Sequence, residues 1–373
     1  MKVAIVTPGR FHVLDLAREL AALGHEVAFY SYVPRRRAEQ FGLPRHCHRA
    51  LLPYVLPLIV AQRKGPGAWS RHLEILLLKA VDNLAARLLE PCDVFIGMSG
   101  LCVRSAQAAR EKYGAKIFLE RASRHILSQK EILEAIPGMP KPAVPEFYVR
   151  RELWGYEFAD AVSIPSRQVE RSFLERGFPK EKLFRNPYGV DFGLFPPTPK
   201  PQNKVPTLVF AGTWSLRKGC DVLAKAIAGQ PWRLIHVGVV GDAPVPKAAN
   251  FESYGFIKQW KLSEIFGEAD ILVLPSREEG LSYVQAQALS CGLPLVCTER
   301  TGGEDLAEAL DDPSWVTVVP LDDVAALRAG IEQALAKAGT QKGVRDILGA
   351  ARERLSWRAY GERYDQKLKT PKI

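Results

Sequence analysis

The sequence predicts an α/β protein made of two doubly wound domains, each a parallel sheet covered by helices on both faces. Two observations carry this prediction. Short apolar strands alternate with amphipathic helices from end to end, and one proline-rich segment, 196–205, interrupts the alternation. With 373 residues, the chain can bury two separate cores. We predict a first domain over 1–196, a second over 197–355 and a terminal segment over 356–373.

In the first half, each expected strand is a short run of mostly apolar residues, and each expected helix shows apolar residues at helical spacing. The strands are expected at 2–7, 26–31, 93–98, 116–119 and 160–164. The helices are expected at 14–23 and 74–89. Apolar strands between amphipathic helices are typical of a parallel sheet that is buried on both faces.

The alternation restarts after the proline-rich segment. The strands are expected at 207–211, 233–238, 271–275, 294–298 and 315–319. The helices are expected near 218–228, 261–268, 282–291, 323–337 and 341–355. Ligands of such sheets bind at the carboxyl ends of the strands, so we expect the site in a cleft between the two domains.

The positive charge is uneven along the chain. The net charge is +10, and residues 1–200 hold 30 Lys and Arg against 20 Asp and Glu, whereas the remainder holds 21 of each. A basic set from Arg35 to Arg71 flanks the apolar run 50–61. Two interpretations stay open: an exposed run that contacts an anionic membrane or an acidic acceptor, or a run packed in the core below a solvated basic surface. No nucleic-acid recognition module appears, so we expect no nucleic-acid partner.

Several features bear on location. The run 50–61 is too short to span a bilayer and contains two prolines. The first residues already read as a strand and a turn, so we expect no signal peptide. The six Cys are scattered, and we expect reduced core thiols. The expected location is the cytoplasm, with peripheral contact at the inner face of a membrane as an extension of that prediction.

The most informative motif is the loop after the expected strand 271–275. It places Glu279 next to Gly280 where a helix begins. Free backbone N–H groups at a helix start can bind an anion, and a carboxylate can accept hydrogen bonds from sugar hydroxyls. A sugar attached to a diphosphate requires both groups in one place.

A second strand-to-helix loop lies in the same half, where Gly212 follows a strand and Arg217-Lys218 precede a helix. Cations beside free N–H groups suit a diphosphate, although a solvated pair at a helix start is the alternative. Two such loops at one edge of one sheet would face a common ligand. Together they predict a site for a nucleotide diphosphate sugar.

In order and spacing, these motifs resemble the retaining glycosyltransferases of the family 4 group. The matching segments are 1–27, 159–191, 212–219, 275–280 and the Trp-containing segment from 356. The resemblance implies the GT-B fold, in which two Rossmann-like domains face a central cleft and a C-terminal helix crosses back to the first domain. It implies transfer of a hexose from a UDP- or GDP-type donor to an acceptor hydroxyl, with retention at the anomeric carbon. The acceptor would be a carbohydrate, a lipid-linked molecule or a small molecule.

The resemblance also implies roles on the donor side. Lys218 would contact the diphosphate, and Glu279 the donor-sugar hydroxyls. The segment 254–257 would line the nucleobase pocket, unless its aromatic residues belong to the core. The other implied donor-binding residues are Gly212, Thr213, Arg217, Phe256, Ile257, Ser276, Gly280, Leu281, Ser282 and Gln287.

Three positions depart from the family pattern. Gln287 stands where the family usually has a second Glu that binds the ribose; an amide can still hydrogen-bond a hydroxyl, but without the charge. Thr213 stands where the usual Arg follows Gly212, and Arg217 could restore that cation. Ser282 replaces a glycine. These departures leave two alternatives open: a degenerate or non-catalytic nucleotide-sugar-binding protein, and a GT-B sugar-nucleotide epimerase.

On the first domain, the resemblance implies that the loop with Gly9, Arg10 and His12 faces the acceptor and the donor phosphates. A plain helix-start role is the alternative for His12.

The expected strand 116–119 leads Glu120, Arg121 and His125 into the cleft. One of Glu120 and His125 would meet the sugar or orient the acceptor hydroxyl, and Arg121 would add positive charge. A Glu120–Arg salt bridge with an exposed His125 is the alternative. No Asp-x-Asp motif appears, so no metal or other cofactor is expected, and the departing diphosphate would take the acceptor proton.

Overall fold

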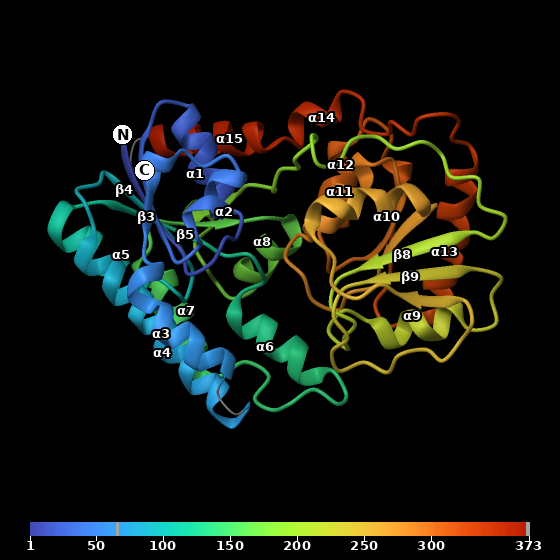
Figure 1. Cartoon of the computed structure of the whole chain (residues 1–373), viewed down its shortest axis with the longest axis horizontal. Coiled ribbons are helices and arrows are strands. Elements are labelled where there is room, and N and C mark those ends of the chain that lie inside the picture. Colours follow the sequence, from blue (N-terminus) through green and yellow to red (C-terminus); the bar gives the residue numbers. More distant parts are fainter. Residues whose placement is uncertain (65–66, 371–373) are drawn as a thin grey trace.

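The computed structural model describes residues 1–64 and 67–370, and it contains two parallel sheets that lie side by side, each with helices packed on it (Figure 1). The prediction of two doubly wound α/β domains is confirmed. The first sheet has the strand order β3-β2-β1-β4-β5-β6-β7. Its strands are β1 (Lys2–Val6), β2 (Glu26–Ser31), β3 (His48–Ala50), β4 (Val94–Met98), β5 (Lys116–Glu120), β6 (Ala161–Ile164) and β7 (Leu183–Arg185).

The second sheet has the order β10-β9-β8-β11-β12-β13. Its strands are β8 (Thr207–Ala211), β9 (Arg233–Val237), β10 (Phe251–Ser253), β11 (Ile271–Leu274), β12 (Leu295–Thr298) and β13 (Val316–Val319). β8 and β11 are neighbours, with Leu208 opposite Ile271, so the loops that follow these two strands emerge side by side. This adjacency brings the two predicted donor motifs together.

The helices of the first domain are α1 (Val13–Ala22), α2 (Arg35–Gln40), α3 (Leu52–Lys64), α4 (Gly67–Leu88), α5 (Val103–Tyr113), α6 (Ile126–Ala135), α7 (Glu146–Phe158) and α8 (Arg167–Leu174). Those that follow β8 are α9 (Cys220–Ile227), α10 (Leu262–Glu268), α11 (Tyr283–Ser290), α12 (Gly303–Ala309), α13 (Val324–Gly339), α14 (Ala351–Arg354) and α15 (Trp357–Lys369). The central strands are buried on both faces, as expected for helices that cover both sides of a parallel sheet.

The C-terminal helix α15 packs against α1 of the first domain, which confirms the predicted crossing back. Ser356 caps α15 by accepting a hydrogen bond from the backbone N–H of Ala359 at 2.9 Å. The chain can cross here because Gly189 lies against it: a Cβ at Gly189 would be 2.4 Å from the backbone nitrogen of Trp357. The predicted boundaries at 196 and 355 both fall in loops, and as domain limits they stay predictions.

Two sequence expectations differ from the structure. Of the helix expected over 341–355, only α14 forms, because Gly343 and Gly349 adopt left-handed φ values of +60° and +47°. Most of the apolar run 50–61 forms α3. The interpretation that this run is packed in the core is wrong for one face of the helix, where Tyr54, Leu56 and Val60 are exposed.

The three-residue strands β3, β7 and β10 were not predicted, because runs this short carry no recognisable period. All six Cys lie in the described ranges and are buried and unpaired. In those ranges, none of the helices combines the length and the apolar composition needed to cross a bilayer.

Candidate functional site

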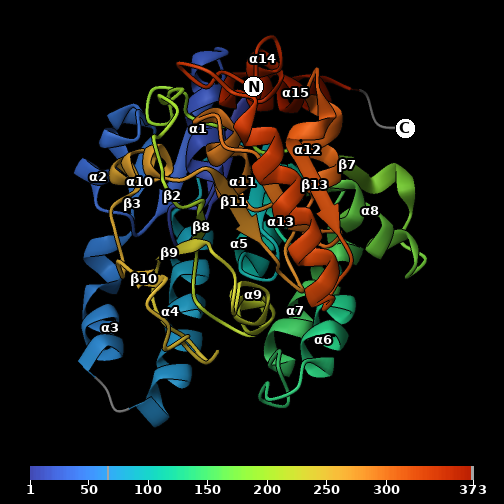
Figure 2. The ribbon, with the colours of Figure 1, turned by 90° about the vertical axis from the view of Figure 1, so that its right-hand side faces the viewer.

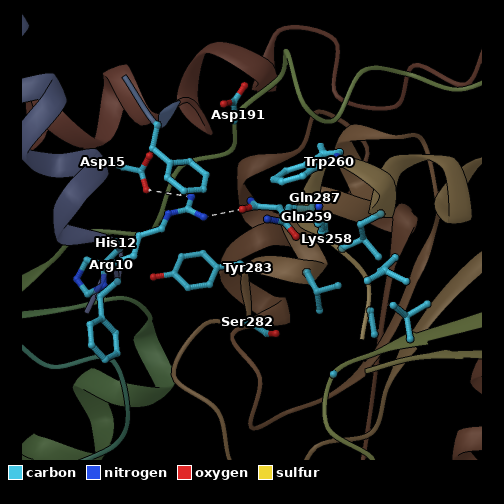
Figure 3. Close-up of a pocket in the computed structure, with 18 of the residues that line it drawn as sticks. Arg10, His12, Asp15, Asp191, Lys258, Gln259, Trp260, Ser282, Tyr283 and Gln287 are labelled. Atoms are coloured by element: carbon cyan, nitrogen blue, oxygen red, sulfur yellow. Dashed lines mark hydrogen bonds and ion pairs between the residues drawn. The ribbon is translucent and has the colours of Figure 1, made fainter. Parts of the chain in front are cut away.

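A cleft of about 830 Å³ lies between the two domains (Figure 3). One wall comes from the β1–α1 loop and α2 of the first domain, and the other from the loops of the second sheet and the start of α11. Seven of the predicted site residues line it: Arg10, His12, Gly212, Phe256, Ile257, Ser282 and Gln287.

The segment 254–257 contributes exposed aromatic residues to the second-domain side. Phe256 is 78% exposed and lines the cleft with Ile257. The alternative that this ring belongs to the hydrophobic core is therefore wrong. Tyr254 is also exposed, but it lies outside the cleft lining, 3.4 Å from the guanidinium of Arg233.

The sequence interpretation missed the continuation of this segment, Lys258-Gln259-Trp260, and Tyr283, all of which line the cleft. Trp260 is exposed, with the Lys258 ammonium 5.2 Å from its ring centre. An exposed aromatic face in a cleft is a suitable platform for a nucleobase. The four residues directly follow predicted ones, so extending both segments would have found them. Gln287 lies on the same wall (Figure 3).

The predicted diphosphate cation and sugar carboxylate meet, but they bind each other. The Lys218 ammonium pairs with Glu279 Oε1, and the Arg217 guanidinium lies 3.0 Å from the same oxygen. Burial works against the charge of Arg217, but Glu279 and Glu278 outweigh it and raise the pKa of the guanidinium. The cations are therefore in place at the strand ends, and a bound diphosphate would have to take over Lys218 from Glu279.

Glu278 is a buried carboxylate that the sequence interpretation passed over. It pairs with Arg217 at 3.4 Å and reaches the first domain, where it accepts hydrogen bonds from Ser123 and, at 3.3 Å, from Gln129. In the sequence, only the position of Glu278 beside Glu279 could have indicated that it belongs to the site. It joins the donor-side cation to the β5–α6 loop of the first domain.

Gly280 forms a second junction between the domains. Ser166 Oγ donates to the carbonyl of Gly280 at 2.7 Å, and Gln168 Nε2 donates to that of Glu279 at 2.6 Å. A Cβ at Gly280 would lie 1.9 Å from the carbonyl oxygen of Ala122 in the first domain. Only glycine allows the predicted sugar-binding loop to approach the opposite domain this closely.

Several predicted donor residues lie outside the cleft lining. Ser276 and Leu281 are buried, whereas Thr213 is exposed beside Gly241. Within the described residues, these three do not contribute to the cleft lining, nor do Gly9, Arg217, Lys218, Glu279 and Gly280. Their binding roles stay predictions.

On the first domain, His12 and Glu120 form a buried pair, with His12 Nε2 2.7 Å from Glu120 Oε2. Tyr360 of α15 donates to the same oxygen at 3.3 Å. Burial alone would raise the pKa of Glu120, but the hydrogen bond and charge of His12 outweigh it and hold the pKa below its usual value. The Glu120–Arg salt bridge considered from the sequence is wrong, because the partner of Glu120 is His12.

The pair leaves two buried polar atoms without a partner. Within the described residues, His12 Nδ1 and Glu120 Oε1 have no hydrogen-bond partner. A histidine fixed by a carboxylate through one ring nitrogen presents the other as an acceptor or a donor, according to its protonation. Of this pair, His12 is the one that lines the cleft.

Arg121 and His125 lie behind the first-domain wall. The Arg121 guanidinium donates hydrogen bonds to Glu152 at 2.6 Å, to Gln129 at 2.7 Å and to a backbone carbonyl. His125 caps α6, accepting a hydrogen bond from the N–H of Leu127 at 3.3 Å. Burial and the charge of Arg121 lower the pKa of His125 to about 4, so the ring is neutral near pH 7. His125 is buried, so the alternative of an exposed His125 is wrong. Its catalytic role stays a prediction.

Arg10 spans the cleft. Its guanidinium donates to Gln259 Oε1 of the second domain at 2.6 Å and lies 3.8 Å from Asp15 (Figure 3). The next residue, Phe11, has a φ of +35°, which is unfavourable for an aromatic residue. The β1–α1 loop is therefore held in a strained form that places Arg10 across the opening.

Both halves of the chain match glycosyltransferase families. The family described as "Glycosyl transferase 4-like domain" matches residues 9–189, and the family described as "Glycosyl transferases group 1" matches residues 205–337.

Among curated proteins, a D-inositol 3-phosphate glycosyltransferase of Segniliparus rotundus is 29% identical over 184 residues, which is 42% of this chain and 40% of that protein. A GDP-mannose-dependent alpha-(1-6)-phosphatidylinositol monomannoside mannosyltransferase of Mycolicibacterium smegmatis is 27% identical over 207 residues, covering 48% of this chain and 53% of that protein. The chain thus matches about half of each relative.

Solved structures share the fold across the whole chain. Sucrose-phosphate synthase of Thermosynechococcus elongatus superimposes with a TM-score of 0.70 at 19% identity, covering 98% of both chains. Anabaena Alr3699/HepE, in complex with UDP and glucose, superimposes with a TM-score of 0.68 at 13% identity, covering 100% of both chains.

Proposed function

The chain belongs to the GT-B glycosyltransferases of the family 4 group, and from this premise we propose that it transfers a hexose from a nucleotide diphosphate sugar to an acceptor hydroxyl, with retention at the anomeric carbon. The observation that carries the proposal is the meeting of Lys218 and Glu279 at the ends of neighbouring strands, beside a cleft with exposed aromatic faces. The first group suits a diphosphate, the second a sugar, and the aromatic faces suit a base.

The donor would lie across the second-domain wall. Its base would stack near Phe256 and Trp260, and its ribose would hydrogen-bond Gln287. Its diphosphate would replace Glu279 as the partner of Lys218, and the released carboxylate would then accept hydrogen bonds from the donor-sugar hydroxyls. Solved HepE complexes with UDP and with UDP-glucose support this class of donor for the fold, and we propose a UDP- or GDP-type donor here.

In the proposed reaction, the bond between the anomeric carbon and the phosphate oxygen breaks while the acceptor oxygen bonds to that carbon on the same face. The acceptor proton passes to the departing diphosphate. Lys218 and Arg217 stabilise the charge that develops on it. His12, held by Glu120, would hydrogen-bond the acceptor hydroxyl from the first domain. We propose that no metal is needed, so a chelator should leave turnover unchanged.

The test is acceptor-dependent release of nucleoside diphosphate from a panel of nucleotide sugars. Lys218→Ala should lower this rate at subsaturating donor by at least about tenfold, the scale of one lost charge-assisted contact. Turnover of Lys218→Ala close to that of the unmodified protein would refute the assignment.

Two alternatives give different results in the same assay. A sugar-nucleotide epimerase would convert or hydrolyse the donor without an acceptor. Thr213 and Gln287, which depart from the family pattern, leave a non-catalytic protein as the second alternative. Such a protein would bind nucleotide but would release no nucleoside diphosphate from a nucleotide sugar with any acceptor.

The acceptor is proposed as a carbohydrate, a lipid-linked molecule or a small molecule. The mycolicibacterial relative, named for a phosphatidylinositol mannoside substrate, supports the lipid-linked class. The proposed location is the cytoplasm.

A further inference from the structure

Helix α3 presents an apolar face to solvent. Tyr54, Leu56 and Val60 are 61%, 49% and 43% exposed. The opposite face of the helix is packed through Val55. Between Leu52 and Gln62 the sequence contains no charged residue, so the exposed side of this helix is apolar along most of its length. A surface helix normally turns its polar side to water, which makes this arrangement a mark of an interaction surface.

Cations border this face. Arg63 follows it on α3, and the adjacent helix α4 adds exposed Arg71 and Lys79 together with the exposed side chain of Leu76. Figures 1 and 2 show α3 and α4 as neighbouring long helices at one side of the first domain. On α2, which precedes β3 and α3 in the chain, the three consecutive arginines 35–37 are all exposed.

Charge decides between the occupants that could cover such a face. The excess of Lys and Arg lies in the first half of the chain, which carries this face, so a second copy would bring like charges together. An anionic bilayer offers an apolar layer for Tyr54, Leu56 and Val60 and phosphate groups for the bordering cations.

We propose that the exposed face of α3 inserts into the headgroup boundary of an anionic membrane, with the arginines of α2 and α3 contacting the lipid phosphates. Arg37 of α2 also lines the cleft, so the docked membrane would lie beside the cleft opening. This geometry would let a lipid-linked acceptor reach the site from the bilayer. Only that last consequence rests on the proposed function; the docking does not.

The test is co-sedimentation of the full chain with vesicles of phosphatidylcholine alone or mixed with phosphatidylglycerol, in the absence of donor. The unmodified protein should bind only the mixed vesicles. Leu56→Gln/Val60→Gln should lower the partition coefficient at least about tenfold, because two apolar side chains no longer insert. Arg35→Gln/Arg36→Gln should lower it by roughly fivefold per cation removed.

Leu174→Gln on α8 is the matched control, since Leu174 is 40% exposed and α8 lies at the opposite side of the molecule from α3 in Figure 2; this variant should bind vesicles normally. Circular dichroism and nucleotide binding without vesicles check that each variant is folded, and they keep the docking test separate from the donor assignment. Equal binding to both vesicle types, or unchanged binding of Leu56→Gln/Val60→Gln, would overturn the proposal. A dimer that this double variant converts to a monomer would assign the face to self-association instead.

Discussion

The candidate site has two halves, an open cleft and a charged group beside it, and they differ in what fills them. The half lined by Phe256, Trp260 and Gln287 is open, and its aromatic side chains are exposed. In the other half, Lys218 and Arg217 are bound to Glu279. The base end of the site is therefore open to a ligand, whereas at the diphosphate end the ligand must first replace Glu279 as the partner of Lys218 and Arg217.

The two halves also differ in how they join the domains. At the open half, Arg10 reaches Gln259 through one hydrogen bond. At the filled half, Gly280 lies against Ala122, and Glu278 bonds two first-domain side chains. Changes at the interdomain contacts of the filled half should therefore affect catalysis more than binding, and changes at the open half should do the reverse.

The largest expected effect is at Gly280. In Gly280→Ala, the added methyl group would collide with the carbonyl of Ala122, so the domains could not close on the donor sugar. We expect turnover to fall about a hundredfold, the cost of misplacing reacting groups by about an ångström. Nucleotide affinity, measured by calorimetry, should change little, because the collision is with the first domain.

Gly339→Ala on α13 is the control for this prediction, since nothing lies within 4 Å of the added Cβ there. It should keep full turnover. Normal turnover of Gly280→Ala would show that the two domains need not approach as closely as they do here.

The second prediction concerns how the free energy of unfolding depends on acid pH. The β5–α6 loop contacts the filled half through Ser123 and ends at His125. The lowered pKa of about 4 means that the unfolded chain binds a proton at higher pH than the folded chain does. The stability from this site is therefore complete above about pH 6.5 and is lost as the pH falls toward 4, by on the order of 2–3 kcal/mol.

His125→Asn can still cap α6 but cannot titrate. Denaturant unfolding at a series of pH values should show a smaller loss between pH 6.5 and 4 for this variant than for the unmodified protein. Parallel pH curves would remove His125 as the source of acid sensitivity.

The third prediction tests the wall opposite the donor. Glu120→Gln removes the charge that fixes His12, so we expect turnover to fall roughly tenfold while nucleotide affinity stays unchanged. A matched pair exists elsewhere, because His25 Nε2 lies 2.8 Å from Asp365 where α15 meets the first domain. Asp365→Asn should leave turnover intact. An equal loss in both variants would indicate a structural effect alone.

The smallest effect is expected at the open half. Gln287→Glu should tighten nucleotide binding by about threefold to tenfold, because a charged acceptor strengthens a hydrogen bond to a ribose hydroxyl. Gln287→Leu, similar in size, should weaken it. If Gln287→Glu instead lowers the melting temperature and leaves affinity unchanged, the residue has a packing role.

The sequence was informative where local order decides the structure. The loops that carry Lys218 and Glu279 were expected to face one ligand, because both follow strands of one parallel sheet and such loops share one edge. That β8 and β11 are neighbouring strands was not predicted and comes from the structure. The partner of Glu120 could not be chosen in this way. His12 is 108 residues away, and Arg121 and Arg124 were nearer candidates in the chain.

Two other features depend on tertiary contacts. The need for glycine at 280 arises from the opposite domain, and no local pattern encodes the carbonyl of Ala122. Similarly, the apolar run 50–61 was visible in the sequence, but which of its side chains face solvent follows from the packing of α3 on α4.

Calorimetric titration with UDP, GDP, their sugars and the free nucleosides shows whether the site binds a nucleoside diphosphate through Lys218. We expect saturable binding of one diphosphate and its sugar, weaker binding of the nucleoside, and at least about a tenfold loss of diphosphate affinity in Lys218→Ala. Binding of the diphosphate that is unchanged in Lys218→Ala, or no binding of any diphosphate, would refute the proposed site.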